Sequence, residues 1–230
     1  MSIVISEDQY QSWKGKKVSD MDLGEWESWA LDFFHNKDYI KDPWLQITIR
    51  LDITKARENY LANYKPTEFA SFTAFLTWKL IKAMDEHPWS RTRKVNGEWY
   101  CFDNLPLFFP VAVGGSKRFF EPVVFNSVES EWVDFCRNWR EAISGENPNK
   151  LDHGLWSLSH FIGNLPNLDF TAFTLHKGVD DTARPFFYFG QRTENNGTYT
   201  IPLSINFDHA NSDPFVINQL METFKELITS

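Results

Sequence analysis

Near the end of the chain, a strict alternation of apolar residues gives way to a polar junction and then to a helical pattern. From Tyr199 to Phe207 every second residue is apolar. Because side chains in a strand point alternately to its two faces, this run predicts a strand with one buried face. Pro214 to Ile228 instead predicts an amphipathic helix that begins with a proline. Its inward residues are predicted to be Phe215, Leu220, Phe224 and Leu227. A half-buried strand followed by an amphipathic helix favours helices layered on a sheet.

The same two patterns recur earlier in the chain. Helices are predicted at residues 26–34, with Asp22 as a possible N-cap, at 67–84, before the His87-Pro88 break, and at 131–143. Strands are predicted at 45–53, 99–102, 107–113, 170–176 and 185–191, with tight turns at Asn96-Gly97 and Asn195-Asn196-Gly197. The sequence shows no internal repeat and no flexible linker. It therefore predicts a single domain over residues 1–230, an α+β two-layer sandwich in which helices pack on a mixed β-sheet.

Composition and charge narrow the class of partner. The 230-residue chain carries a net charge of −8, which argues against nucleic acid or an anionic membrane as the main partner. Its aromatic fraction of 17% predicts a core of large side chains, and aromatics also line pockets and interfaces. Cys101 and Cys136 lack metal-ligand spacing, so we expect no metal and two buried thiols in a reducing compartment. We find neither a membrane-spanning run nor a signal peptide, and we therefore expect a cytoplasmic protein.

The junction between the last strand and the last helix carries the residues best suited to chemistry. His209 follows the strand directly, and Asp213 precedes the helical Pro214. Histidine can take and return a proton near neutral pH, so a histidine held at the end of a strand is a candidate general base. Asp213 could cap the helix with its carboxylate or fix the loop through an ion pair. His176 and Asp180 have the same spacing, so spacing does not identify the base, but His176 leads into a charged loop.

From Trp26 to the C-terminus, the chain resembles the chloramphenicol acetyltransferases. The family signature is a strand, a pair of histidines, Ala, two residues, Asp, Gly and an aromatic, and residues 208–215 match its second histidine, alanine, aspartate and aromatic. Leu51-Asp52-Ile53-Thr54 resembles the end of the family's first strand. Residues 161–166, followed by 170–173, resemble its central segment. These matches occur in the family's order along the chain.

The resemblance implies a fold, an assembly and a reaction. It implies a homotrimer with active sites at the subunit interfaces, where coenzyme A and the acceptor reach the catalytic histidine from opposite ends of a tunnel. His209 would deprotonate an acceptor hydroxyl, which attacks the thioester of acetyl-CoA or another acyl-CoA directly. Asp213 would have the structural role of the family's aspartate.

Some positions depart from the family pattern around the histidine. Asp208 takes the place of the first histidine, and Pro214 takes the place of the glycine. The arginine that pairs with the family's aspartate falls at Ser28. Asp213 is therefore expected to find another partner, such as the backbone amides of the last helix.

The departure with the largest chemical consequence lies at Gly163. The resemblance places there the serine that steadies the oxyanion, and losing such a donor typically costs about 10²–10³ in rate. The threonine of the same region falls at Tyr188. We hypothesise that Gly163 vacates volume and that the Tyr188 phenol takes over the serine's position. The alternatives are a backbone amide, an ordered water, or a Tyr188 that merely fills the acceptor pocket.

The resemblance also assigns binding residues. Phe34 and His35 fall on the acceptor-contacting helix, where His35 is expected to line the pocket or the surface. With Tyr188, they favour an acceptor other than chloramphenicol. On the cofactor side the family's lysine and tyrosine fall at Gln191 and Arg192, of which Arg192 could meet a phosphate. Asn167 replaces an aromatic in the same region.

Three functions remain open from the sequence. The first is acyl transfer from coenzyme A to a hydroxyl, or an amine, of a small molecule such as an antibiotic or a biosynthetic intermediate. The second keeps His209 but takes the acyl group from an acyl carrier protein. The third is a non-catalytic small-molecule-binding trimer, which has no need of the base.

Overall fold

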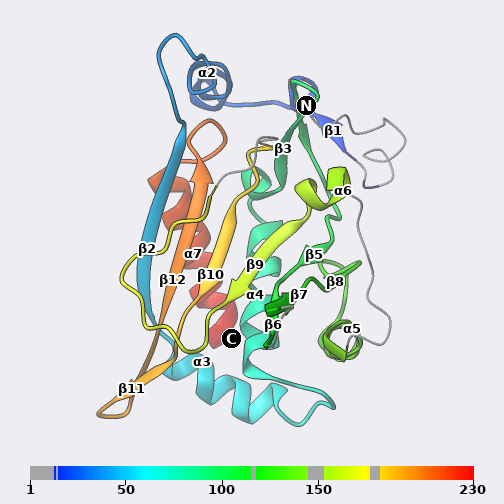
Figure 1. Ribbon diagram of the computed structural model, residues 1–230, viewed down its shortest axis with the longest axis vertical. Coiled ribbons are helices and arrows are strands. Elements are labelled where there is room, and N and C mark those ends of the chain that lie inside the picture. The colour runs from blue at the N-terminus through cyan, green and yellow to red at the C-terminus, as the bar shows by residue number, and fades with distance from the viewer. Residues whose placement is uncertain (1–12, 14, 115–117, 145–152, 177–181) are drawn as a thin grey trace.

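The computed structural model describes residue 13 and residues 15–114, 118–144, 153–176 and 182–230 (Figure 1). In these parts of the chain the strands are β1 (Lys16–Lys17), β2 (Trp44–Asp52), β3 (Thr92–Val95), β4 (Glu98–Cys101), β5 (Leu107–Phe108), β6 (Val111–Gly114), β7 (Arg118–Phe120), β8 (Val123–Val124), β9 (His160–Asn164), β10 (Phe186–Phe189), β11 (Thr193–Asn195) and β12 (Thr198–Asp208). The α-helices are α2 (Glu25–Phe33), α3 (Thr54–Asn59), α4 (Phe72–Asp85), α5 (Trp132–Ser144), α6 (His153–Leu158) and α7 (Pro214–Thr229). The shorter helical segments are η1 (Val18–Asp20), η2 (Tyr60–Tyr64) and η3 (Pro88–Arg91).

A seven-stranded mixed sheet forms the centre of the molecule. Strand β12 is its longest member and pairs antiparallel with β2 on one side and with β10 and β11 on the other. Beyond β10 the pairing becomes parallel, from β10 to β9 and from β9 to β5, and β8 closes that edge antiparallel. The predicted mixed sheet is confirmed.

Helices cover one face of this sheet. In Figure 1, α4 and α7 lie behind β10 and β12. The alternation predicted for the last strand explains this packing, because Ile201, Leu203, Ile205 and Phe207 all enter the core shared with these helices. The sandwich of helices on a mixed sheet is therefore confirmed.

The opposite face carries an irregular segment instead of a further strand. The prediction of a strand at 170–176 is wrong, because this segment crosses β2 and β12 rather than pairing along a neighbour. The carbonyl oxygen of Phe173 accepts hydrogen bonds from Gln46, Ser204 and Asn206 at 2.8, 2.6 and 3.4 Å. The aromatic side chains of this segment, Phe170 and Phe173, pack on the sheet against Phe161 and Tyr188. Periodicity correctly indicated buried aromatics but not the backbone partner.

All four predicted helices are present, with corrected boundaries. The helix predicted at 67–84 begins at Phe72, because Ser71 accepts a hydrogen bond from the Ala74 amide at 3.1 Å and caps it. The helix predicted at 26–34 is α2, but its N-cap is Gly24 and not Asp22. In α7, Leu220 and Phe224 are buried as predicted, whereas Phe215 is 71% exposed, so its inward placement is wrong. Helix α3 and η2 were not predicted.

Several smaller predictions are also settled. The strand predicted at 107–113 is divided into β5 and β6, and its halves belong to different sheets. Positive φ angles at Asn96 and Gly97, and at Asn196 and Gly197, confirm both predicted turns. Cys101 and Cys136 are unpaired and buried, and burial raises the pKa of the Cys136 thiol to about 12.

A candidate active site at the end of strand β12

His209 is the first residue after β12, and its surroundings fix the state of its ring. Its backbone amide donates to the carbonyl oxygen of Pro43 at 2.9 Å. Its Nδ1 lies 3.0 Å from the carbonyl oxygen of Ser212. Since a carbonyl oxygen can only accept, Nδ1 carries a hydrogen, and in the neutral ring this leaves the lone pair on Nε2. This is the protonation pattern that a general base requires.

Asp213 holds the start of α7 and does not form an ion pair. Its Oδ1 accepts from the amides of Phe215 and Val216 at 2.7 and 2.9 Å. Within the described residues it contacts no lysine or arginine. Of the two roles that the sequence left open, the structure has the helix cap, and the backbone amides of the last helix are the partners expected in place of the missing arginine.

The loop between these residues is also tied down. The amide of Ala210 donates to Oδ1 of Asp208 at 2.8 Å, and the amide of Ser212 donates to the Asp208 carbonyl at 3.1 Å. The Asn211 side chain donates to the carbonyl oxygens of Thr92 and Ala183, both at 3.2 Å. The loop therefore presents His209 from a rigid support.

His209 lines a cavity of about 380 Å³. The cavity lies between η1, α2, η3 and the start of α7, and includes Ala30, Trp89 and Gln219 among its lining residues. Its charged lining residues are the carboxylates Asp22, Glu27 and Asp213, together with two titratable histidines, His87 and His209. No lysine or arginine lines this cavity as far as the described residues extend.

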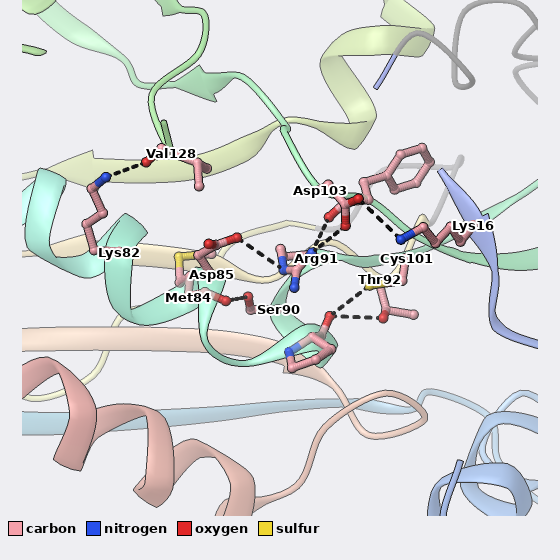
Figure 2. Close-up of polar contacts among 12 residues, drawn as sticks. Lys16, Lys82, Met84, Asp85, Ser90, Arg91, Thr92, Cys101, Asp103 and Val128 are labelled. Atoms are coloured by element: carbon pink, nitrogen blue, oxygen red, sulfur yellow. Dashed lines mark hydrogen bonds and ion pairs between the residues drawn. The ribbon is translucent and has the colours of Figure 1, made fainter. Parts of the chain in front are cut away.

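The wall formed by η3 is held by a set of polar contacts, which Figure 2 shows. Arg91 contacts Asp103 at 3.1 Å and Asp85 at 3.6 Å, and it also donates to the Phe102 carbonyl at 2.8 Å. The Ser90 hydroxyl donates to the Met84 carbonyl at 2.7 Å. The Thr92 hydroxyl donates to the Pro88 carbonyl at 3.1 Å. These contacts join η3 to the end of α4 and to the β3–β4 hairpin, so this wall is not a loose loop.

Of the three residues predicted to contact the acceptor, Phe34 and His35 lie next to the junction, directly after α2 and not on the helix as expected. The ring of Phe34 stacks on the His209 imidazole, with centroids 4.0 Å apart and an interplanar angle of 27°. His35 lies beside Asp208, and its Nε2 is 2.8 Å from Oδ2 of that carboxylate. The structure thus brings Phe34 to the candidate base, and it gives His35 a partner that the sequence analysis missed.

Gly163 and Tyr188 face each other on adjacent parallel strands. The register of β9 and β10 pairs them, and a Cβ built on Gly163 would lie 2.1 Å from Cε1 of Tyr188. The tyrosine ring therefore occupies the space that any side chain at 163 would need. This supports the first half of the predicted exchange, in which the glycine vacates volume for the tyrosine.

Within one chain, this pair does not reach His209. Tyr188 pairs with Ser204, four residues before Asp208, so about 13 Å of strand separates the two positions. Gln191, Arg192 and Asn167 are exposed and lie still farther away. The Gly190 amide, next to Gln191, bonds to Pro202, about 20 Å along β12 from Asp208.

Comparison with known proteins now adds to this geometry. No family model matches the chain. A chloramphenicol acetyltransferase from Escherichia coli is 26% identical over 186 residues, which cover 78% of this chain and 80% of that protein. A solved chloramphenicol acetyltransferase structure has a TM-score of 0.74 at 17% identity and covers 93% of this chain and 99% of that one. In sequence and in fold, this chain is a divergent relative of these chloramphenicol acetyltransferases.

The fold extends to a second group of acetyltransferases. A dihydrolipoamide acetyltransferase from Azotobacter vinelandii has a TM-score of 0.62 at 15% identity, covering 93% of this chain and 94% of that one. The chloramphenicol acetyltransferase relatives support acyl transfer as the general class of reaction. No cluster of candidate metal ligands occurs in the described parts of this chain, and none of its described helices is long and apolar enough to cross a membrane.

One part of the site could not be found from sequence patterns. Lys94, His35 and Asp208 form a continuous line of polar contacts beside His209. His35 and Asp208 are 173 positions apart, and His35 and Lys94 are 59 apart, so no local motif connects them. The visible signal was the aspartate at the place of the family's first histidine, next to the candidate base.

Proposed function

We propose that this protein is an acyltransferase that moves an acetyl or other acyl group from coenzyme A to a hydroxyl of a small molecule, with His209 as the general base. The observation that carries the proposal is the hydrogen bond from Nδ1 to the Ser212 carbonyl, which leaves Nε2 free to accept a proton. A protein that only binds a ligand has no need to fix this tautomer at the edge of a cavity.

The reaction follows from that lone pair. Nε2 removes the proton of the acceptor hydroxyl as its oxygen attacks the carbonyl carbon of the thioester. The tetrahedral intermediate then collapses by cleavage of the carbon–sulfur bond. The imidazolium returns its proton to the leaving thiolate, so the products are the ester and free coenzyme A, and the base is regenerated.

The cavity beside His209 fits the acceptor better than the cofactor. Coenzyme A carries several phosphates, whereas the charged side chains that line this cavity at neutral pH are the carboxylates Asp22, Glu27 and Asp213. Like charges at short range are unfavourable, so an anionic cofactor would be repelled here and a neutral or cationic acceptor would not. For the cofactor side we retain Arg192, Gln191 and Asn167, whose exposed side chains lie toward the opposite end of β12.

For the oxyanion we propose the phenol of Tyr188, supplied by a neighbouring copy in a homotrimer. Burial raises the pKa of this phenol to about 12, so it stays protonated and can donate a hydrogen bond at neutral pH. Because Tyr188 and His209 of the same chain lie far apart, a Tyr188 phenol can reach His209 only across an interface between two copies of the chain. Tyr188→Phe keeps the ring and removes the donor, and a fall in kcat of about 10²–10³ is expected. Unchanged turnover on the true acceptor would remove this assignment.

A thiol-release assay with acetyl-CoA across hydroxylated compounds, antibiotics included, tests the main proposal. His209→Ala should abolish release, because it removes the imidazole that is proposed to take the proton of the acceptor hydroxyl. The matched control is His176→Ala, since His176 has the same spacing to an aspartate but is exposed at the end of the crossing segment. Its partner Asp180 lies outside the described residues.

The same assay separates the remaining alternatives. Transfer from an acyl carrier protein with none from acetyl-CoA would assign the second donor. Thermal stabilisation by a ligand with no transfer from either donor would mean a binding protein and would refute the proposal.

A further inference from the structure

Asp208, His35 and Lys94 lie in line beside the candidate base, and an inference from them rests on the proposed function of His209. Asp208 is fully buried, and its two carboxylate oxygens have separate partners. Oδ1 accepts from the Ala210 amide at 2.8 Å, and Oδ2 lies 2.8 Å from Nε2 of His35. On the other side of the His35 ring, Nζ of Lys94 lies 2.9 Å from Nδ1.

These contacts fix the polarity of the His35 ring. The ammonium of Lys94 can only donate, so Nδ1 of His35 must accept. Nε2 therefore carries the hydrogen and donates it to the carboxylate of Asp208, which ends the line on a buried negative charge. Both ring nitrogens are engaged, and His35 is left with no lone pair for an acceptor. It is thus not a second base.

The line acts on His209 from two sides. Through Ala210, Asp208 holds the residue that follows His209. Through His35, it holds the start of the α2–β2 connection, where the adjacent Phe34 stacks on the His209 imidazole at 4.0 Å. The Trp99 ring on β4 packs against the His35 ring in an edge-to-face arrangement, with centroids 5.1 Å apart. The His35 imidazole is therefore the point at which strand β12, hairpin β3–β4 and the segment after α2 meet.

We propose that Lys94, His35 and Asp208 form a positioning array that sets the orientation of His209 and its stacking on Phe34, and thereby the rate of proton removal. None of the three contacts the reacting atoms. Their effect should appear in kcat, because a misaligned base slows proton transfer without weakening the binding of acyl-CoA.

Substitutions at His35 test the array through its polarity. In His35→Gln, the amide nitrogen can donate to Asp208 and the amide oxygen can accept from Lys94, so the direction of the line is kept. His35→Phe removes both contacts and leaves an aromatic ring. We expect kcat to fall about 10–100-fold in His35→Phe, with KM for acetyl-CoA unchanged, and to recover most of that loss in His35→Gln.

Asp208→Asn probes the other end of the array. In either orientation its amide nitrogen would face a donor, which is the Nε2–H of His35 or the amide of Ala210, so a kcat loss of the same size is expected. The matched control is Asp134→Asn, which neutralises an exposed aspartate paired with Arg137 on α5 and should leave kcat unchanged. If Asp208→Asn does not fold, the two His35 variants still decide the question, because the His35 side chain is at the partly exposed end of its hydrogen bond with Asp208.

A second measurement does not depend on activity. The ¹H and ¹⁵N resonances of the His209 ring report its tautomer and the ring current of Phe34 in the unliganded protein. We expect them to move in His35→Phe and in Asp208→Asn, and to stay near wild type in His35→Gln and Asp134→Asn. Shifts of this pattern in a protein without transferase activity would support the array and refute the proposed function.

Two results would overturn the array itself. The first is His35→Phe with wild-type kcat and an unmoved His209 spectrum. The second is a loss in His35→Gln as large as that in His35→Phe, because polarity would then not be what the ring supplies.

Discussion

At the scale of single residues, Gly163 and Tyr188 determine each other's size. A Cβ on Gly163 would lie within 2.5 Å of three atoms of the tyrosine ring, which belongs to an aromatic cluster with Phe161 and Phe173. The ring cannot simply swing away, because its neighbours are packed against it. With Tyr188 in place, position 163 therefore has no room for a side chain, as the exchange hypothesised from the sequence requires.

A double-mutant cycle measures this coupling. Gly163→Ala should lower the free energy of unfolding by about 1–3 kcal/mol, because the added methyl overpacks the cluster. In a Tyr188→Leu background, the loss of unfolding free energy caused by Gly163→Ala should be smaller by more than about 0.5 kcal/mol, because the ring that the added methyl meets is gone. Urea denaturation of the four proteins gives both values. Equal costs in the two backgrounds would mean that the strand backbone moves to admit the methyl.

A second prediction at this scale concerns His160. This residue on β9 is 1% exposed, and burial, followed by the charges of Arg93, Arg91 and Arg184, holds its pKa well below 6.5. The native ring stays neutral while the unfolded chain binds a proton. The contribution of His160 to stability is therefore complete above about pH 6.5 and is lost as pH falls, at about 1.4 kcal/mol per unit.

Urea denaturation between pH 7.5 and 5.5 checks this loss. His160→Gln should flatten the slope by about that amount, whatever its stability at pH 7.5. Some slope should remain, because burial also lowers the pKa of His87. A variant with the wild-type slope would show that native His160 takes up a proton after all.

At the scale of elements, the sequence predicts those whose apolar pattern coincides with their burial. Strand β12 and helix α7 were predictable because strict alternation and helical spacing mark the apolar face that enters the core. The prediction of a single buried face is wrong for β12, however, because Ser204, Asn206 and Asp208 on its other face are buried as well. Segment 170–176 was not, because Phe170 and Phe173 pack on the sheet while the backbone makes isolated hydrogen bonds. Helix α3 with η2 was missed because its buried face includes Asn59, a polar residue that bonds to the C-terminal carbonyls of Ile228 and Ser230.

The start of α7 gives a test at this scale. Asp213→Ala removes the acceptor for two backbone amides and should cost about 1 kcal/mol of stability. It should also lower kcat, because the neighbouring Ser212 carbonyl fixes the His209 tautomer. Asp213→Asn keeps a capping oxygen and should change both much less. Urea denaturation and steady-state rates decide this, and an Asn variant as impaired as Ala would mean that the charge, rather than the cap, matters.

At the scale of the whole molecule, the base and its proposed oxyanion donor are on parts of the chain that cannot meet. His209 was identifiable from sequence because it ends a predictable strand within an ordered set of family matches. The Lys94–His35–Asp208 line was not, because it joins three elements distant in sequence. The proposed donor can therefore complete the site only from a second copy of the chain, since Tyr188 is about four residues of strand from the junction.

A complementation experiment tests this arrangement. Because each site of a cyclic trimer would take His209 from one copy and Tyr188 from its neighbour, His209→Ala and Tyr188→Phe chains should each be deficient alone. When the two are unfolded together and refolded at equal amounts, about a quarter of the sites should contain both intact residues by random assembly. Activity should then recover to about a quarter of wild type, with a trimer mass measured by light scattering. Mixed trimers that stay as inactive as either parent would place both residues in a site within one chain, and this would contradict the separation along β12.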